Sequence, residues 1–282
     1  LSAAYYHHEA IPLFDTAAAA FDHPLGDDMQ RAIRLYRGAN YLATGRVNDA
    51  EPDLRALVSD LGSIHEPDSQ AKVLSNLGTL ARRQGDYTSA RQYYQQALDI
   101  FTQIGDPANQ ATILNNLGVV ADSLGDSTLA RKYYGQALDI LIQINHLRGQ
   151  AVISNNLGAL ASKQGDYAAA RQYHQQGLDI SNHVGDSGGQ ANALNNLGAV
   201  ANSQGKYDAA YQYHQQALSI FVQVGNPNGQ AEALAGLGTV ARLQDDYPSA
   251  HQYYQQALDI FTRIGNPSGQ IIALSNLGII AG

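Results

Sequence analysis

The sequence predicts an all-α solenoid built from antiparallel helix hairpins. Three observations support this prediction: a segment of 40 residues recurs in constant phase, each copy carries two apolar stripes with helical spacing, and turn signals occur twice per copy. A single hairpin cannot bury its apolar stripes alone. Neighbouring hairpins must therefore stack into one continuous core.

The repeated segment keeps its length along most of the chain. Segment 71–110 recurs as 111–150, 151–190, 191–230 and 231–270 without insertion or deletion. Each of these repeats ends on glutamine: Gln110, Gln150, Gln190, Gln230 and Gln270. Such regular recurrence is typical of repeat proteins and predicts equivalent structural units.

The repeat phase extends to both ends of the chain. Residues 31–70 form a degenerate repeat, and Pro52 early in its second helix predicts atypical packing. Residues 1–30 match the second half of a truncated repeat, and residues 271–282 match the first helix of another. We expect all of these segments to form one solenoid domain.

The termini suggest how the chain relates to a longer protein. The chain begins at Leu1, and its only methionine is Met29, so we expect it to be a piece of something longer. The final segment, 271–282, carries a stripe of large aliphatic residues that a second helix would partly cover. This exposed stripe predicts end-to-end self-association of the piece.

Apolar residues within one repeat follow helical spacing. Leu114, Leu117 and Ala121 are separated by three, four and seven positions, so they share one face of a first helix. Tyr94 and Ala97 belong to the corresponding stripe of a second helix. Each repeat therefore contains two amphipathic helices.

Turn signals separate these helices. Gly85 suits a left-handed C-cap that ends a first helix, and Asp86 suits the N-cap of the second. Between repeats, Gly225 ends a helix, Asn226 caps the next, and Pro227 takes the first helical position, where its missing N–H is harmless. Each repeat is thus predicted to be a helix–turn–helix unit.

The motif Leu-x-x-Leu-Gly-x-x-Ala, followed by Gly-Asp-Tyr-x-x-Ala-x-x-x-Tyr-x-x-Ala, resembles the tetratricopeptide repeat. Its 40-residue unit exceeds the roughly 34 residues usual in that family. It is more similar to the longer repeats of kinesin light chain, Pins-type adaptors and bacterial signalling proteins. The resemblance implies a right-handed superhelix with first helices lining a concave groove. Ala121 departs from the family, which usually has a larger residue there.

Composition and charge exclude several function classes. The chain has 282 residues and a net charge of −8, which argues against nucleic acid as a partner. No window resembles a membrane span or a signal peptide, so we expect no membrane partner. There is no cysteine, so neither a disulfide nor a thiolate metal site can form, and we expect a cytoplasmic protein.

An asparagine row follows the side of the first helices that lies opposite their apolar stripe. It consists of Asn76, Asn116, Asn156, Asn196 and Asn276, with an interruption at Gly236, and it is preceded in the middle repeats by Asn115, Asn155 and Asn195. Asparagine is less favourable than alanine in a helix by roughly 0.5 kcal/mol, so its recurrence needs a reason. An amide can both donate to and accept from a peptide main chain. The resemblance implies this role, while duplication of a neutral residue and bonding between neighbouring helices are the structural alternatives.

Variable side chains flank the asparagine row, as positions that determine specificity would. The predicted peptide contacts among them are Lys72, Arg82, Arg83, Lys163, Asn202 and Arg242. No charge of one sign dominates this set, so the ligand's charge stays open.

Apparent catalytic motifs have structural explanations. Segment 185–189 reads Gly-Asp-Ser-Gly-Gly, a serine protease signature, but the same phase elsewhere is the cap between repeats, and a triad also needs an oriented base. His174 and His214 replace core tyrosines one period apart, so we expect core histidines rather than metal ligands. We therefore predict no enzyme, no metal and no cofactor.

Two functions fit these observations. The first is a scaffold that binds a protein or extended peptide in the concave groove, as part of a larger regulatory or signalling protein. The alternative is a structural spacer, or a self-associating or autoinhibitory sensor arm with no peptide ligand of its own. The mixed residues that flank the asparagine row favour the first.

Repeat 151–190 carries three unusual residues and is expected to be the least stable internal repeat. Ser154 replaces a core leucine, Gly177 replaces a helical alanine, and Ser181 replaces phenylalanine or leucine. The glycine alone destabilises a helix by roughly 1 kcal/mol. We expect its amide hydrogens to exchange fastest among the internal repeats.

Overall fold

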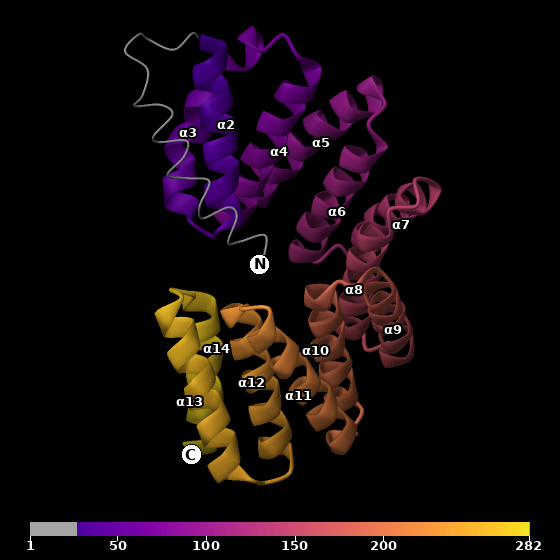
Figure 1. Ribbon diagram of the computed structural model, residues 1–282, viewed down its shortest axis with the longest axis vertical. Coiled ribbons are helices and arrows are strands. Elements are labelled where there is room, and N and C mark those ends of the chain that lie inside the picture. Colours follow the sequence, from indigo (N-terminus) through magenta and orange to yellow (C-terminus); the bar gives the residue numbers. More distant parts are fainter. Residues whose placement is uncertain (1–26, 282) are drawn as a thin grey trace. The chain divides into compact units, whose positions relative to one another are not determined.

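The computed structural model describes residues 27–281, and this part of the chain is built of helices without any strand (Figure 1). The predicted all-α solenoid fold is confirmed. A truncated repeat was expected at residues 1–30, but residues 1–26 of it lie outside the described part of the chain. None of the helices in the described part is both long and apolar enough to cross a membrane.

Each hairpin consists of a first and a second helix. The first helices are α2 (Asp27–Ala43), α4 (Pro67–Arg83), α6 (Pro107–Ser123), α8 (Leu147–Lys163), α10 (Ser187–Ser203), α12 (Pro227–Leu243) and α14 (Pro267–Ala281). The second helices are α3 (Val47–Asp60), α5 (Tyr87–Ile104), α7 (Ser127–Gln143), α9 (Tyr167–Val184), α11 (Tyr207–Gln223) and α13 (Tyr247–Arg263). A short 3-10 helix, Leu61–Ser63, follows α3.

The hairpins fall into two compact units, Leu1–Asn145 and His146–Gly282. The first unit contains α2 to α7, and the second contains α8 to α14. Within each unit, a second helix packs against its own first helix and against the first helix of the next hairpin. This stacking buries both apolar stripes and produces the solenoid arrangement.

The turn signals read from the sequence form the expected caps. Gly85 adopts a left-handed φ of +81°, and the Asp86 carboxylate accepts a hydrogen bond from the Ser89 N–H at 3.0 Å. In the protease-like segment, Asp186 accepts from the Gly189 N–H at 3.0 Å and caps α10. That segment is therefore a cap between repeats.

In α4, α6, α8, α10 and α12, a glycine allows a ring of the second helix to touch the first-helix backbone. A Cβ at Gly118 would lie 2.5 Å from the Tyr134 ring, and one at Gly158 would lie 2.6 Å from the His174 ring. The same contact recurs at Gly78, Gly198 and Gly238. Side chains at these positions would push the ring away, so the glycine sets the separation of the two helices.

The glutamine that ends each of the repeats 71–110, 151–190, 191–230 and 231–270 joins that repeat to the next hairpin, and we call this contact the glutamine link. The Gln110 amide donates to the main-chain carbonyl of Phe101 at 3.1 Å. Equivalent bonds run from Gln190 to Ser181 at 3.4 Å, from Gln230 to Phe221 at 3.2 Å and from Gln270 to Phe261 at 3.4 Å. The recurrence of glutamine in the sequence thus has a structural cause.

The degenerate repeat keeps the hairpin despite Pro52, which lies inside α3. Leu54 takes the place of the ring and packs against Gly38, where a Cβ would lie 2.8 Å from its Cδ2. Arg37 donates to both carboxylate oxygens of Asp53, at 2.6 and 2.7 Å, and so joins α2 to α3. The packing differs from the other repeats in this replacement of the ring by leucine.

Replacing Gly118 with alanine should destabilise the chain by about 1–3 kcal/mol, because the added methyl group overlaps the Tyr134 ring. Gly135 on α7 is the matched control, since nothing lies within 4 Å of a Cβ built there. Alanine at Gly135 should stabilise the chain by up to about 1 kcal/mol through helix propensity. Urea unfolding followed by circular dichroism measures both effects, and equal effects would contradict the role of the glycine–ring contact.

Candidate functional site

The asparagine row lies along one side of the first helices, which we call the first-helix face. Asn76 on α4 and Asn116 on α6 belong to the first unit, and Asn156 on α8 and Asn196 on α10 belong to the second. All four side chains are partly buried. Asn76, Asn116 and Asn196 make no hydrogen bond within residues 27–281, so their amides are available to a ligand.

The asparagines one position earlier are directed into the hairpins. Asn155 Oδ1 lies 3.0 Å from His174 Nδ1, and Asn195 Oδ1 lies 2.7 Å from His214 Nδ1. Because an amide oxygen only accepts, Nδ1 of each histidine carries the proton. The alternative of bonding between neighbouring helices therefore applies to Asn155 and Asn195.

Both histidines are core residues, as the sequence analysis expected. His174 is 1% exposed and His214 is 2% exposed. Burial lowers the pKa of each to about 4, because the charged imidazolium would lose its hydration. Both rings are therefore neutral at pH 7.

The interruption of the asparagine row at Gly236 has a packing cause. A Cβ at this position would lie 2.4 Å from Cε1 and 2.5 Å from Nδ1 of His214. The His214 ring also approaches Asn202, whose Nδ2 lies 3.4 Å from Nε2. Asn202, a predicted peptide contact, thus turns toward the buried histidine.

The first unit contains a pocket of about 500 Å³ lined by residues of α2, α4 and the segment that precedes α4. Tyr36, which is 52% exposed, and Lys72 both line it. Tyr36 occupies on α2 the repeat position that Asn76 occupies on α4. Tyr36 was not among the residues predicted from the sequence. It lies one repeat length, 40 residues, before Asn76, and this spacing places it at the same repeat position.

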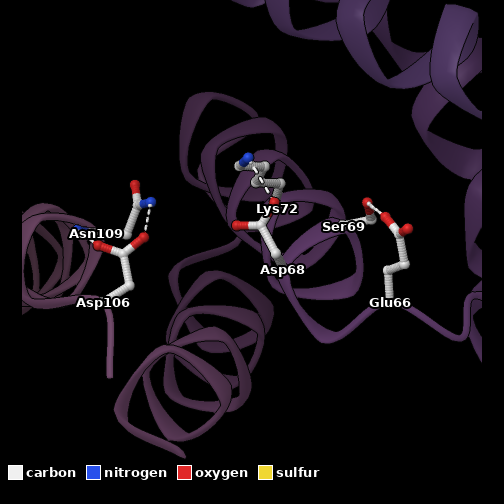
Figure 2. A network of polar contacts seen from close by, with 6 residues as sticks. All are labelled: Glu66, Asp68, Ser69, Lys72, Asp106 and Asn109. Atoms are coloured by element: carbon white, nitrogen blue, oxygen red, sulfur yellow. Dashed lines mark hydrogen bonds and ion pairs between the residues drawn. The ribbon is translucent and has the colours of Figure 1, made fainter. Parts of the chain in front are cut away.

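Figure 2 shows the polar groups at the start of α4 and α6. Lys72 Nζ lies 2.6 Å from Asp68 Oδ2, and this hydrogen bond raises the pKa of Lys72. Asp106 accepts from the Asn109 N–H at 3.0 Å, which lowers the pKa of Asp106, and Lys72 contributes further to this lowering. The Lys72 ammonium therefore interacts with carboxylates from two successive first helices while its side chain stays 43% exposed.

The other predicted contacts lie near the C-terminal ends of the first helices. Arg82 and Arg242 are partly buried, and their Nε atoms have no partner within the described part of the chain. Arg83 is exposed. Three predicted contacts already interact with other groups of the chain: Asn115, Asn156 and Lys163.

Metal-binding chemistry finds no support in the described residues. No group of three or more histidine, aspartate or glutamate side chains between residues 27 and 281 is arranged to hold a metal ion. The histidine–asparagine pairs are neutral and buried. The features of this face suit recognition of polar backbone and side-chain groups.

The family model of the tetratricopeptide repeat matches residues 28–103, 69–143, 109–183 and 189–263. These matches cover most of the described chain, and the first three overlap in steps of about one repeat. The comparison with curated protein sequences gives no match.

Solved structures share the fold at low sequence identity. A Rap protein complexed with Competence and Sporulation Factor is 15% identical with a TM-score of 0.77, over 98% of this chain and 84% of that one. NprR in complex with its cognate peptide NprX is 15% identical with a TM-score of 0.72, over 95% and 78%. BtubC (BKLC) from P. vanneervenii is 22% identical with a TM-score of 0.59, over 79% and 91%. At these identities the likeness establishes the fold alone.

Lowering the pH should destabilise the second unit. The unfolded histidines have a pKa of about 6.5, so they bind protons that the folded histidines, with pKa values of about 4, do not bind. Stability is therefore lost progressively as the pH falls from about 6.5 toward 4, by up to about 3 kcal/mol per histidine. Urea unfolding at pH 7 and pH 5 measures this loss.

The variant His174→Tyr should remove about half of this pH dependence. Tyrosine is the residue that repeat 111–150 holds at this position, as Tyr134. His251→Gln is the control, since His251 is exposed on α13 and its replacement should leave the pH dependence unchanged. An unchanged pH dependence in His174→Tyr would contradict the assignment.

Proposed function

This chain belongs to the tetratricopeptide repeat family, and we propose that it is a scaffold whose first-helix face binds an extended peptide or protein segment. The repeat of this family is an interaction module and not a catalytic fold. We also propose that the chain is part of a larger regulatory or signalling protein. The cytoplasmic location expected from the composition stays a prediction.

The observation that carries the proposal is the set of unpaired amides on the first-helix face. The side chains of Asn76, Asn116 and Asn196 are partly buried and have no partner in the described chain, although asparagine is unfavourable in a helix. An extended peptide presents N–H and C=O groups that no helix or sheet satisfies. One carboxamide can pair with both kinds of group.

Two further observations support a peptide ligand. The Rap protein carries Competence and Sporulation Factor, and NprR carries its cognate peptide NprX, on the same type of fold. In the first unit of this chain, the pocket beside the asparagine row presents the Tyr36 ring and the Lys72 ammonium. An aromatic ring and a cation next to free amides can hold a ligand side chain while the amides hold its backbone.

Replacing Asn76 and Asn116, which lie on successive first helices of the first unit, with alanine should weaken peptide binding by roughly tenfold, since each lost hydrogen bond contributes about 0.5–1.5 kcal/mol. The free energy of unfolding should stay the same or rise, because alanine favours the helix. The peptide used is one selected against the wild-type chain from a library of randomised linear peptides. Its affinity is measured by calorimetric titration.

Asn195→Ala is the matched control, because its side chain bonds to His214 and not to a ligand. It should leave peptide affinity unchanged and reduce stability by about 1–3 kcal/mol, since the buried Nδ1–H loses its acceptor. Wild-type affinity in the double variant, or failure to select any peptide, would show that the asparagine row is structural.

Self-association is the second candidate function, and α14 favours it. Four of its aliphatic side chains are exposed: Ile271 by 68%, Ile272 by 56%, Leu274 by 54% and Ile279 by 60%. The equivalent of Leu274 one repeat earlier, Leu234, is only 6% exposed because α13 covers it. A surface of this kind is a candidate association site.

The double variant Ile271→Glu and Ile279→Glu should abolish concentration-dependent association of the chain, because charge on this surface opposes its burial. Static light scattering over a concentration series measures the average mass. Val152→Glu, which changes a residue that is 52% exposed on α8, should leave association unchanged. A wild-type chain that stays monomeric at high concentration would exclude this function.

A further inference from the structure

The hairpin α8–α9 lacks the two large apolar side chains that fill the other repeats between residues 71 and 270. In those repeats a leucine of the first helix packs with a large residue of the second. The pairs that share a buried cluster are Leu74 with Phe101, Leu194 with Phe221 and Leu234 with Phe261. In α8–α9 the same two positions hold Ser154 and Ser181, which are both 0% exposed.

The start of α10 does not move inward to replace the missing ring. A Cβ at Gly189 would lie 2.5 Å from Ser181 Oγ, and a Cβ at Gly269 would lie 2.5 Å from Cγ of Phe261. The serine oxygen thus occupies the position of the first ring carbon. The space that the rest of a phenyl ring fills in other repeats lies beyond it.

Two other contacts show that the helices keep their ordinary spacing. The glutamine link from Gln190 measures 3.4 Å, the same as that from Gln270. Within the hairpin, a Cβ at Gly158 would lie 2.6 Å from the His174 ring, against 2.7 Å for the Gly198 contact of the next repeat. Because these two contacts keep the spacing that they have in other repeats, we expect the volume of the missing leucine and phenylalanine side chains to stay unfilled.

Small side chains surround this space. Ala191, Ala217 and Ala233 accompany Leu194 and Phe221 in the cluster of hairpin α10–α11. Their counterparts one repeat earlier are Ala151, Gly177 and Ala193, all of them buried. These three residues carry no charge. Two polar groups lie beside them: the Asp186 carboxylate, whose Oδ2 is 2.8 Å from the same Gly189 Cβ position and which caps α10, and the Asn155 amide beside Gly177.

The hydroxyl groups of Ser154 and Ser181 are buried and have no hydrogen-bond partner within the described residues. Other helical hydroxyls in the chain bond to their own helix, as Thr102 does to the Leu98 carbonyl at 2.7 Å and Ser123 to the Val119 carbonyl at 2.9 Å. Leaving a buried hydroxyl unpaired is unfavourable. Two such groups at paired core positions of one hairpin mark a polar site that lacks its partner.

We propose that hairpin α8–α9 contains an internal binding site for a small uncharged molecule that carries a hydroxyl group on an apolar body. Ser154 and Ser181 hold the hydroxyl, and Ala151 and Ala193 contact the apolar part. Charged ligands are excluded because their dehydration is unfavourable, and the one carboxylate beside Ser181, Asp186, repels anions and already caps α10. Because both serines are sealed from solvent, the ligand enters when the hairpin opens locally.

Phenol is the probe for this site, because its ring replaces the missing phenyl group and its hydroxyl faces the serines. Calorimetric titration of the full chain should show saturable binding of one phenol per chain. Ser154→Ala and Ser181→Ala should each weaken phenol binding roughly fivefold, as expected for loss of one net hydrogen bond. Toluene, which has the ring without the hydroxyl, should bind these variants at least as well as the wild-type chain.

The variant Ser154→Leu with Ser181→Phe restores the side chains of the other repeats and fills the space. It should abolish phenol binding and raise the melting temperature. If this variant does not fold, the single alanine variants still test the site. The proposal is overturned by absence of saturable phenol binding, by equal phenol affinity in the alanine or filled variants, or by a crystal structure at saturating phenol with only ordered water between the serines.

Discussion

The contact between a first-helix glycine and a second-helix ring determines the geometry of the hairpins from residue 71 to 270. It brings the ring against the backbone, so the polar atoms of the ring reach the first helix from a fixed direction. Tyr94 and Tyr254 then pair with hydroxyls of the first helix, at 3.0 Å from Thr79 and 3.2 Å from Thr239. Where the ring is histidine, the first helix supplies an asparagine oxygen instead. Repeat 111–150 follows neither pattern, because Tyr134 faces a helix that has Val119 at the threonine position and Asn115 at the asparagine position.

This constraint separates two asparagines that look alike in the sequence. Asn195 and Asn196 are neighbours on one helix, but only Asn195 reaches the His214 ring. The second is left for the outside because successive helical residues point in directions about 100° apart. The His214 ring also leaves no room for a side chain at position 236, which is glycine. The position of the His214 ring therefore explains both why Asn195 is a packing residue and why Asn196, next to it, is a candidate ligand contact.

Much of the fold could be predicted because its signals are local. Gly85 and Asp86 specify a helix end and a helix start by their own conformational preferences, and the period of 40 residues places every later element. The candidate site depended instead on contacts across helices. Which amides are free, and the cause of the gap at Gly236, follow from ring positions that no spacing rule contains. Tyr36 was missed because its repeat has lost the asparagine that marks the row.

In repeat 151–190, too, the role that a residue suggests in the sequence differs from the contacts that it makes in the structure. From the sequence, Gly177 is a lost alanine that weakens a helix. In the structure, a Cβ there would lie 3.0 Å from both polar atoms of the Asn155 amide, which bonds to His174. The glycine thus gives room to a buried polar pair. Repeat 191–230 keeps Ala217 at the same position beside the equivalent Asn195–His214 pair, so the histidine alone does not require the glycine.

The acceptor of the glutamine link is a main-chain carbonyl, so the link between two repeats does not depend on the side chain of the acceptor residue. Phe101 and Ser181 differ in size and polarity, yet each offers the same carbonyl oxygen to the next repeat. A mutation at the acceptor residue alters the interior of one hairpin without removing its attachment to the following one. The core residues of an individual repeat can therefore change during evolution while its hydrogen bond to the next repeat is kept.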